Sequence, residues 1–203
     1  MADKTPEMID LVFDLNGGIL PADYPFSLWA ALIHHVPELA QEGLVGVLPL
    51  RATENKAGLL LAKRAKLALR LPKTLAGSAA ARLSGNAMQL GTFSLSLGQC
   101  TSRAIQPYPT IHAQQVASTR DEVMFMDETK AQLSEMGIAA KLICGKPRVI
   151  LGGQQPINCY SLVLHDLKPE ASVELQYVGL GGNRKFGCGI FIPYKVISGL
   201  SDD

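Results

Sequence analysis

Five glycines within eleven residues, from Gly179 to Gly189, form the segment that most restricts how this chain can fold. Glycine has no Cβ, so its backbone adopts positive φ readily and can approach a ligand closely. Successive backbone N–H groups in such a loop form a concave anion site. The pair Arg184-Lys185 at the centre of the loop favours phosphate as that anion. A plain turn between a helix and a strand is the alternative interpretation.

The spacing of the glycines argues against two common nucleotide sites. A dinucleotide fingerprint is G-x-G-x-x-G, placed after a strand and opening a helix. Here the third position is Arg184, and the predicted helix precedes the loop while the strand follows it. The Gly-Lys-Ser/Thr tripeptide of a P-loop does not occur in the sequence. A polynucleotide backbone is therefore the phosphate-bearing ligand that the loop favours.

Composition indicates a well-cored protein whose basic surface must be local. Hydrophobic residues make up 47% and charged residues 18%, and the net charge is only +1. Nucleic acid would therefore bind a patch, not the whole surface. The four cysteines have no C-x-x-C spacing, which predicts reduced thiols and neither disulfides nor a metal site. No export signal or membrane span is recognisable, so the sequence predicts a cytoplasmic protein with no membrane partner.

Hydrophobic periodicity predicts the order β-α-β-β-α-β twice. The first half has strands over 9–15, 43–50, 58–71 and 86–97, a helix from Asp23-Tyr24-Pro25 to Pro37, and a helix over 72–83. The second half has strands over 110–118, 141–150, 158–167 and 190–194, and helices over 121–136 and 168–178. This order predicts an α+β fold of two tandem ferredoxin-like (RRM-like) units, residues 1–106 and 107–203.

The two predicted units, with a loop of pattern G-φ-G-x(5)-G-x-G before the last strand, resemble the RAMP superfamily of CRISPR-associated proteins. Within it, the chain resembles the repeat-specific endoribonuclease that processes CRISPR precursor RNA. The residues that carry this resemblance are Gly179-Leu180-Gly181, residues 187–191, residues 19–23, Gly46-Val47 and residues 67–72. It spans nearly the whole chain.

The resemblance implies an endoribonuclease that uses neither metal nor cofactor. The RNA 2′-hydroxyl attacks the adjacent phosphate and leaves a 2′,3′-cyclic phosphate, which requires a base, an acid and a cation. It also implies CRISPR repeat RNA as a partner, with the enzyme retained on the hairpin of the mature guide in a Cascade-type complex. A non-cutting RNA-binding subunit of a CRISPR effector, or of a CRISPR-associated transposon complex, is the alternative.

The same resemblance places the general base on or just after the first helix, often beside a tyrosine. The predicted catalytic residues are therefore His35, His34 and Tyr24. At 100° per residue His35 borders the apolar face of this helix, near Tyr24, and His34 lies on its polar side. Some family members carry a base three residues after a tyrosine, where this chain has Ser27. This departure keeps the non-cutting alternative open.

The predicted RNA-binding residues form three groups. The glycine-rich loop supplies Gly179, Gly181, Gly182, Asn183, Arg184, Lys185, Gly187 and Gly189. The long strand supplies Lys63, Arg64, Lys66 and Arg70, with a solvated sheet face as the alternative interpretation. A strand-turn-strand segment supplies Lys146 and Arg148. His112 is predicted to be a structural or RNA-facing polar residue, and His165 to be structural. A small-molecule enzyme is disfavoured because Asp121-Glu122 and Asp127-Glu128 fit a helix start, where acidic residues complement the dipole.

Overall fold

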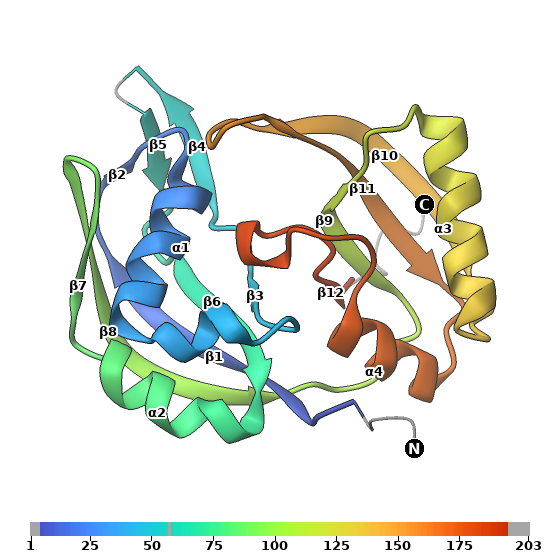
Figure 1. The fold of residues 1–203 in the computed structure, drawn as a ribbon, viewed down its shortest axis with the longest axis horizontal. Helices are drawn as coiled ribbons and strands as arrows, with labels where there is room; N and C mark the ends of the chain where they lie inside the picture. Colours follow the sequence, from blue (N-terminus) through green and yellow to red (C-terminus); the bar gives the residue numbers. More distant parts are fainter. Residues whose placement is uncertain (1–4, 57, 195–203) are drawn as a thin grey trace, which may run out of the picture.

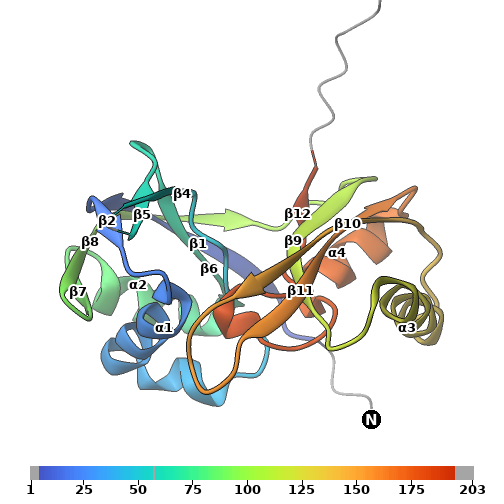
Figure 2. The same ribbon diagram turned by 90° about the horizontal axis from the view of Figure 1, so that it is seen from above.

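The computed structural model describes residues 5–56 and 58–194. Two α/β units lie side by side, with the glycine-rich loop (red) between them (Figure 1). The first unit contains a five-stranded antiparallel sheet in the order β3-β6-β1-β8-β7. Its strands are β1 (Met8–Asn16), β3 (Gly46–Val47), β6 (Lys66–Pro72), β7 (Ala87–Leu90) and β8 (Phe93–Ala104). Helices α1 (Tyr24–His35) and α2 (Lys73–Leu83) cover one face of this sheet (Figure 2).

The second unit contains a four-stranded antiparallel sheet in the order β10-β11-β9-β12. Its strands are β9 (Ile111–Ala117), β10 (Lys141–Ile150), β11 (Ile157–His165) and β12 (Ile192–Pro193), and its helices are α3 (Glu122–Glu135) and α4 (Pro169–Val178). When the four strands of each βαββαβ pattern are numbered along the chain, their order in the sheet is 2-3-1-4 in both units. The predicted α+β fold with two ferredoxin-like units is thereby confirmed.

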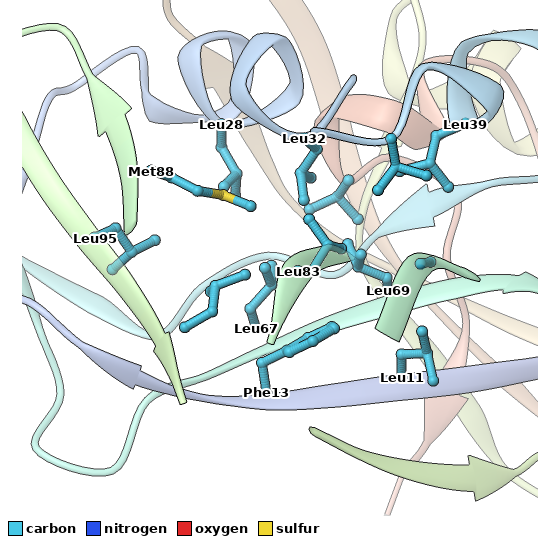
Figure 3. Close-up of a cluster of buried hydrophobic side chains, with 14 of the residues drawn as sticks. Leu11, Phe13, Leu28, Leu32, Leu39, Leu67, Leu69, Leu83, Met88 and Leu95 are labelled. Atoms are coloured by element: carbon cyan, nitrogen blue, oxygen red, sulfur yellow. The ribbon is translucent and has the colours of Figure 1, made fainter. Parts of the chain in front are cut away.

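The core of the first unit explains why its sequence alternates. Leu11 and Phe13 of β1 and Leu67 and Leu69 of β6 point toward α1, and all four are at most 2% exposed (Figure 3). The apolar stripe of α1 meets them with Leu28 and Leu32, both fully buried. Because neighbouring strand residues point to opposite faces, the residues between these leucines lie on the other face of the sheet.

The predicted long strand over 58–71 is wrong, because two strands share that range. β5 (Gly58–Leu61) pairs with β2 (Ile19–Leu20) and β4 (Ala52–Asn55) in a separate three-stranded sheet. A turn separates β5 from β6, with the Ala65 N–H donating to the Ala62 carbonyl at 2.9 Å. Alternation of apolar and polar residues continues across this turn, so periodicity alone does not reveal the break.

Other predicted elements are shorter or differently bounded in the structure. The strand over 43–50 is reduced to β3, and the strand over 190–194 to β12. Pro37 ends α1 as predicted and begins a 3₁₀ helix, Pro37–Gln41. Asp23 occupies the N-cap position of α1, but its side chain makes no capping hydrogen bond. No helix within the described residues has the length and apolar character that a membrane crossing requires.

Candidate nucleic-acid interface

The glycine-rich loop folds back on itself, and this explains two of its glycines. Gly179 caps the C-terminus of α4 and has a φ of +70°, and Gly189 has a φ of +66°. A Cβ on Gly179 would overlap the carbonyl oxygen of Gly189, and a Cβ on Gly189 would overlap that of Leu180. Both glycines are therefore required by close packing of the two limbs of the loop. Gly187 is buried as well, so Gly181 and Gly182 are the exposed glycines of the predicted set.

Arg184 is buried in the interface between the two units, which corrects its predicted role. Its side chain donates hydrogen bonds to the carbonyls of Tyr177 and Val178 in α4 at 3.1 and 3.0 Å. It also donates to Leu44 of the first unit at 3.1 Å and to Gly189 at 3.4 Å. Burial, with a smaller effect of the nearby charge of Arg70, lowers its pKa to about 10, so it stays charged at neutral pH. Arg184 therefore clamps the loop to the first unit, and each of its three guanidinium nitrogens donates to a backbone carbonyl.

Lys185 is the exposed cation of the loop and faces α1. Its ammonium lies 5.1 Å from the centre of the Phe186 ring, which in turn packs 4.2 Å from the Phe26 ring of α1. A cavity of about 530 Å³ between the loop and α1 is lined in part by Lys185, Trp29 and Ile33. The structure thus places the loop cation beside the first helix.

The predicted catalytic residues of α1 lie in different environments. His34 is exposed and His35 half-buried, with their rings edge to face at 5.5 Å. Within the described chain, neither histidine lines the cavity beside Lys185. The Tyr24 hydroxyl accepts a hydrogen bond from the Leu50 N–H at 3.1 Å, and burial raises the pKa of Tyr24. This position gives Tyr24 a packing role, and a high pKa makes it a poor base at neutral pH.

Arg70 also proves to be a structural residue, which corrects its predicted contact with RNA. It is 1% exposed and forms a bidentate ion pair with Asp10, at 2.7 and 3.1 Å. Its guanidinium also donates to the carbonyls of Gln176 and Phe191 in the second unit. Burial alone raises the pKa of Asp10, but the hydrogen bonds and charges of Arg70 and Arg103 outweigh it, so the net pKa is lowered. Arg70 and Arg184 thus both join the first unit to carbonyls at the end of α4.

A basic groove runs between the two units, along the sheet face that bears no helices. Two adjoining hollows of about 710 and 310 Å³ form it, and they share Arg51 and Arg103 in their lining. The basic residues that line the groove are Arg51, Arg64, Lys66, Arg70 and Arg103. Asp10 is its one acidic lining residue among those described, and Arg70 neutralises it. A chain with a net charge of +1 thus concentrates cations here.

Three of the five basic residues that line the groove were predicted from the sequence, and two were not. Arg64 and Lys66, predicted to bind RNA, line it, although Lys66 also pairs with Asp14 at 2.7 Å. Arg51 and Arg103 were not predicted. Arg103 lies opposite Asp10 in the β1–β8 register, on the open face of the sheet. Only knowledge of which strands are neighbours would have revealed it.

His112 lies in the groove and not in a closed core. Its Nδ1 is buried and is the one such side-chain atom in the described chain without a hydrogen-bond partner. The ring contacts Tyr194 edge to face at 5.2 Å, and burial lowers the pKa of the imidazole. His112 is therefore mostly neutral at pH 7 and can donate or accept a hydrogen bond in the groove.

The remaining predicted cations, Lys63, Lys146 and Arg148, are exposed and do not line the groove. Lys63 lies in the turn before β6. Lys146 and Arg148 lie on β10, the edge strand of the second sheet, where the register with β11 shifts. The β10–β11 hairpin reaches from the second unit toward α1 (Figure 2). The described residues include no group of three or more His, Cys, Asp or Glu that could hold a metal ion.

Comparison with known proteins identifies relatives along almost the whole chain. The family model Cas6 Crispr matches residues 9–196. The CRISPR-associated endonuclease Cas6 of Myxococcus xanthus (strain DK1622) is 32% identical over 187 residues, which cover 91% of this chain and 81% of the relative.

Solved structures share the fold at low identity. A CRISPR-associated protein Cas6 has a TM-score of 0.69 at 10% identity, with 93% of this chain and 100% of that one covered. The CRISPR endoribonuclease Cse3 bound to a 19-nucleotide RNA has a TM-score of 0.56 at 12% identity, with 92% and 98% covered.

Proposed function

Because this chain belongs to the Cas6 family of CRISPR-associated proteins, we propose that it is an endoribonuclease that cuts CRISPR precursor RNA within its repeats without a metal ion. The relative in Myxococcus xanthus is named an endonuclease, and a solved structure of the same fold holds RNA. The first observation supports cleavage of a nucleic acid, and the second supports RNA as that nucleic acid.

The observation that carries the proposal is the basic groove between the units. Phosphate contacts by Lys and Arg supply most of the non-specific affinity of a protein for nucleic acid. Arg51 and Arg103 present guanidinium groups in this groove, and the Arg103 side chain is 61% exposed. The groove is elongated and spans both units, so it suits a strand of several nucleotides better than a mononucleotide.

Cleavage needs proton transfers that imidazole groups supply near neutral pH. We assign these transfers to His34 and His35 at the end of α1, with Lys185 as the cation that stabilises the phosphorane. The 2′-oxygen then attacks the phosphorus, the 5′-oxygen leaves with a proton, and the product ends in a 2′,3′-cyclic phosphate. After cutting, the protein stays on the 3′ hairpin of the guide as part of a Cascade complex.

A second function, RNA binding without cleavage, is favoured by one observation. Neither histidine lines the cavity that holds Lys185, within the described residues. RNA binding would have to bring the scissile phosphate to the end of α1. If it does not, the protein holds the guide and leaves the cutting to another subunit.

The test is cleavage of a labelled CRISPR repeat RNA in EDTA, with mapping of the product ends. We expect a cyclic phosphate, and loss of cutting with retained binding in His34→Ala or His35→Ala. His165→Gln is the matched control, because Nδ1 of His165 is hydrogen-bonded to the Thr110 hydroxyl at 3.2 Å, away from α1. Tight binding without any cleavage by the wild type would establish the second function and overturn the first.

A further inference from the structure

A further hollow, without Lys or Arg in its lining among the described residues, lies on the other side of the glycine-rich loop from α1. It has a volume of about 490 Å³ and is bounded by α3, the start of β11 and the loop. This volume falls in the range of small-ligand pockets, about 300–1,000 Å³. Four exposed side-chain amides line it: Gln132 of α3, Gln155 and Asn158 of the hairpin, and Asn183 of the loop.

The chemistry of this lining differs from that of the basic groove. Among the described residues it includes no Lys or Arg, so it offers no counter-charge for phosphate. Each amide presents a donor and an acceptor side by side. Phe125, which is 3% exposed, forms part of the floor of the hollow, and its ring is stacked on Tyr160 with centres 4.8 Å apart. Glu128 is the one charged side chain of the lining among the described residues, and it is ion-paired with Arg120 at 3.1 Å. Such a lining suits a neutral ligand with several hydrogen-bonding groups.

The hollow adjoins the place where we put the phosphate. Gly181, Gly182 and Asn183 line both this hollow and the cavity that holds Lys185. The loop is therefore a thin wall, with a cation on one side and the amides on the other. A nucleotide whose phosphate contacts Lys185 has its own or its neighbour's base within reach of the hollow.

Contacts between the walls hold the hollow in shape. The Ser118 N–H donates to the Asn158 carbonyl at 2.9 Å, and the Cys159 and Cys188 sulfurs lie 3.7 Å apart, which joins β11 to the loop. The tip of the β10–β11 hairpin lies against α1, so close that a Cβ on Gly153 would lie 2.7 Å from the Phe26 ring. Because the pocket walls are already held in place, less conformational entropy is lost when a ligand binds, and the affinity is higher.

We propose that this hollow binds one unpaired nucleobase of the RNA and reads its hydrogen-bonding edge. Sequence-specific RNA recognition uses unstacked bases, held by stacking and by hydrogen bonds to their edges. The inference rests on the proposed function. It adds that Gln132 and Asn158 are the main residues that determine which base is bound.

The test uses a pool of single-stranded RNAs with ten random positions, from which the bound molecules are sequenced. The proteins are the wild type, Gln132→Ala, Asn158→Ala and the control Gln89→Ala, whose amide is exposed on β7. Affinity for the unselected pool and the melting temperature are measured alongside, so that misfolding is recognised.

We expect the wild type to prefer one base at one position by about tenfold, the order that a bidentate amide–base contact provides. Gln132→Ala and Asn158→Ala lose this preference and keep the melting temperature and the affinity for the pool, whereas Gln89→Ala changes none of the three. Binding with no base preference, or with a preference that both pocket variants retain, would overturn the nucleobase site and leave the proposed function standing. A wild type that binds no RNA would overturn both.

Discussion

Replacing Arg184 by alanine tests whether this arginine stabilises the fold or binds phosphate. Its guanidinium makes three hydrogen bonds of 3.0–3.1 Å, to the carbonyls of Leu44, Tyr177 and Val178, and a fourth at 3.4 Å. Arg184→Ala removes them and leaves buried carbonyls without a donor. We expect the protein to lose stability, and to bind RNA as the wild type does at temperatures where it is still folded.

The magnitude follows from the bonds and from the cost of burying the charge. A hydrogen bond to a charged group contributes about 1.5–3 kcal/mol to the free energy of unfolding. The fall of the Arg184 pKa to about 10 indicates that burial opposes the charged form by roughly 3 kcal/mol. The three short bonds outweigh this cost by about 3 kcal/mol, which lowers the melting temperature of a chain of this length by about 6–12 °C.

The matched variant is Lys185→Ala, one residue along the loop, because Lys185 is exposed and forms no hydrogen bond or ion pair within the part of the chain that the structure describes. We expect its melting temperature to change little and its affinity for repeat RNA to fall. Calorimetry and fluorescence anisotropy on both variants measure the two effects. If Arg184→Ala melted like the wild type and bound RNA weakly, the arginine would be a phosphate ligand and the structural argument would be refuted.

Three further variants test other parts of the structure. Asp10→Asn leaves Arg70 buried without its counter-ion and should lower the free energy of unfolding by about 3–5 kcal/mol. Because the pKa of Asp10 is lower in the folded than in the unfolded protein, its stabilising effect is present above the unfolded pKa of about 3.8 and is lost as the pH falls from there through the folded pKa. Acid titration should therefore show a loss of stability in the wild type that the variant lacks. Tyr24→Phe should cost about 1 kcal/mol in urea unfolding and leave cleavage unchanged, and a large loss of cleavage would restore Tyr24 to the active site. Arg51→Ala with Arg103→Ala should reduce the slope of log affinity against log salt by about 1.4 for single-stranded RNA, and an unchanged slope would place the RNA elsewhere.

Much of the fold was predictable because periodicity reports which face of an element is buried. The alternation around Leu11 and Phe13, and the spacing of Leu28 and Leu32, gave β1 and α1 within one or two residues. The break between β5 and β6 was not predicted, because the same alternation of apolar and polar residues runs through two strands that belong to different sheets. Which strand pairs with which depends on contacts far apart in the sequence, and local pattern does not contain them.

The site was less predictable, because residue type does not reveal burial. Arg184 and Lys185 are adjacent basic residues in one loop, yet one is 7% exposed and the other faces solvent. Arg70 shares its strand with Lys66 and its sheet face with Arg103, but the second unit covers it. These differences arise where the two units meet, and the sequence of either unit alone carries no sign of them.

The most direct test of metal-independent cleavage is a single 2′-deoxy nucleotide at the scissile position of the repeat RNA, assayed in EDTA beside the all-ribose RNA. Attack by the 2′-hydroxyl predicts that the ribose RNA is cut and that the deoxy RNA is bound equally well and stays intact. Cleavage of the deoxy RNA, or cleavage that EDTA abolishes, would contradict the account.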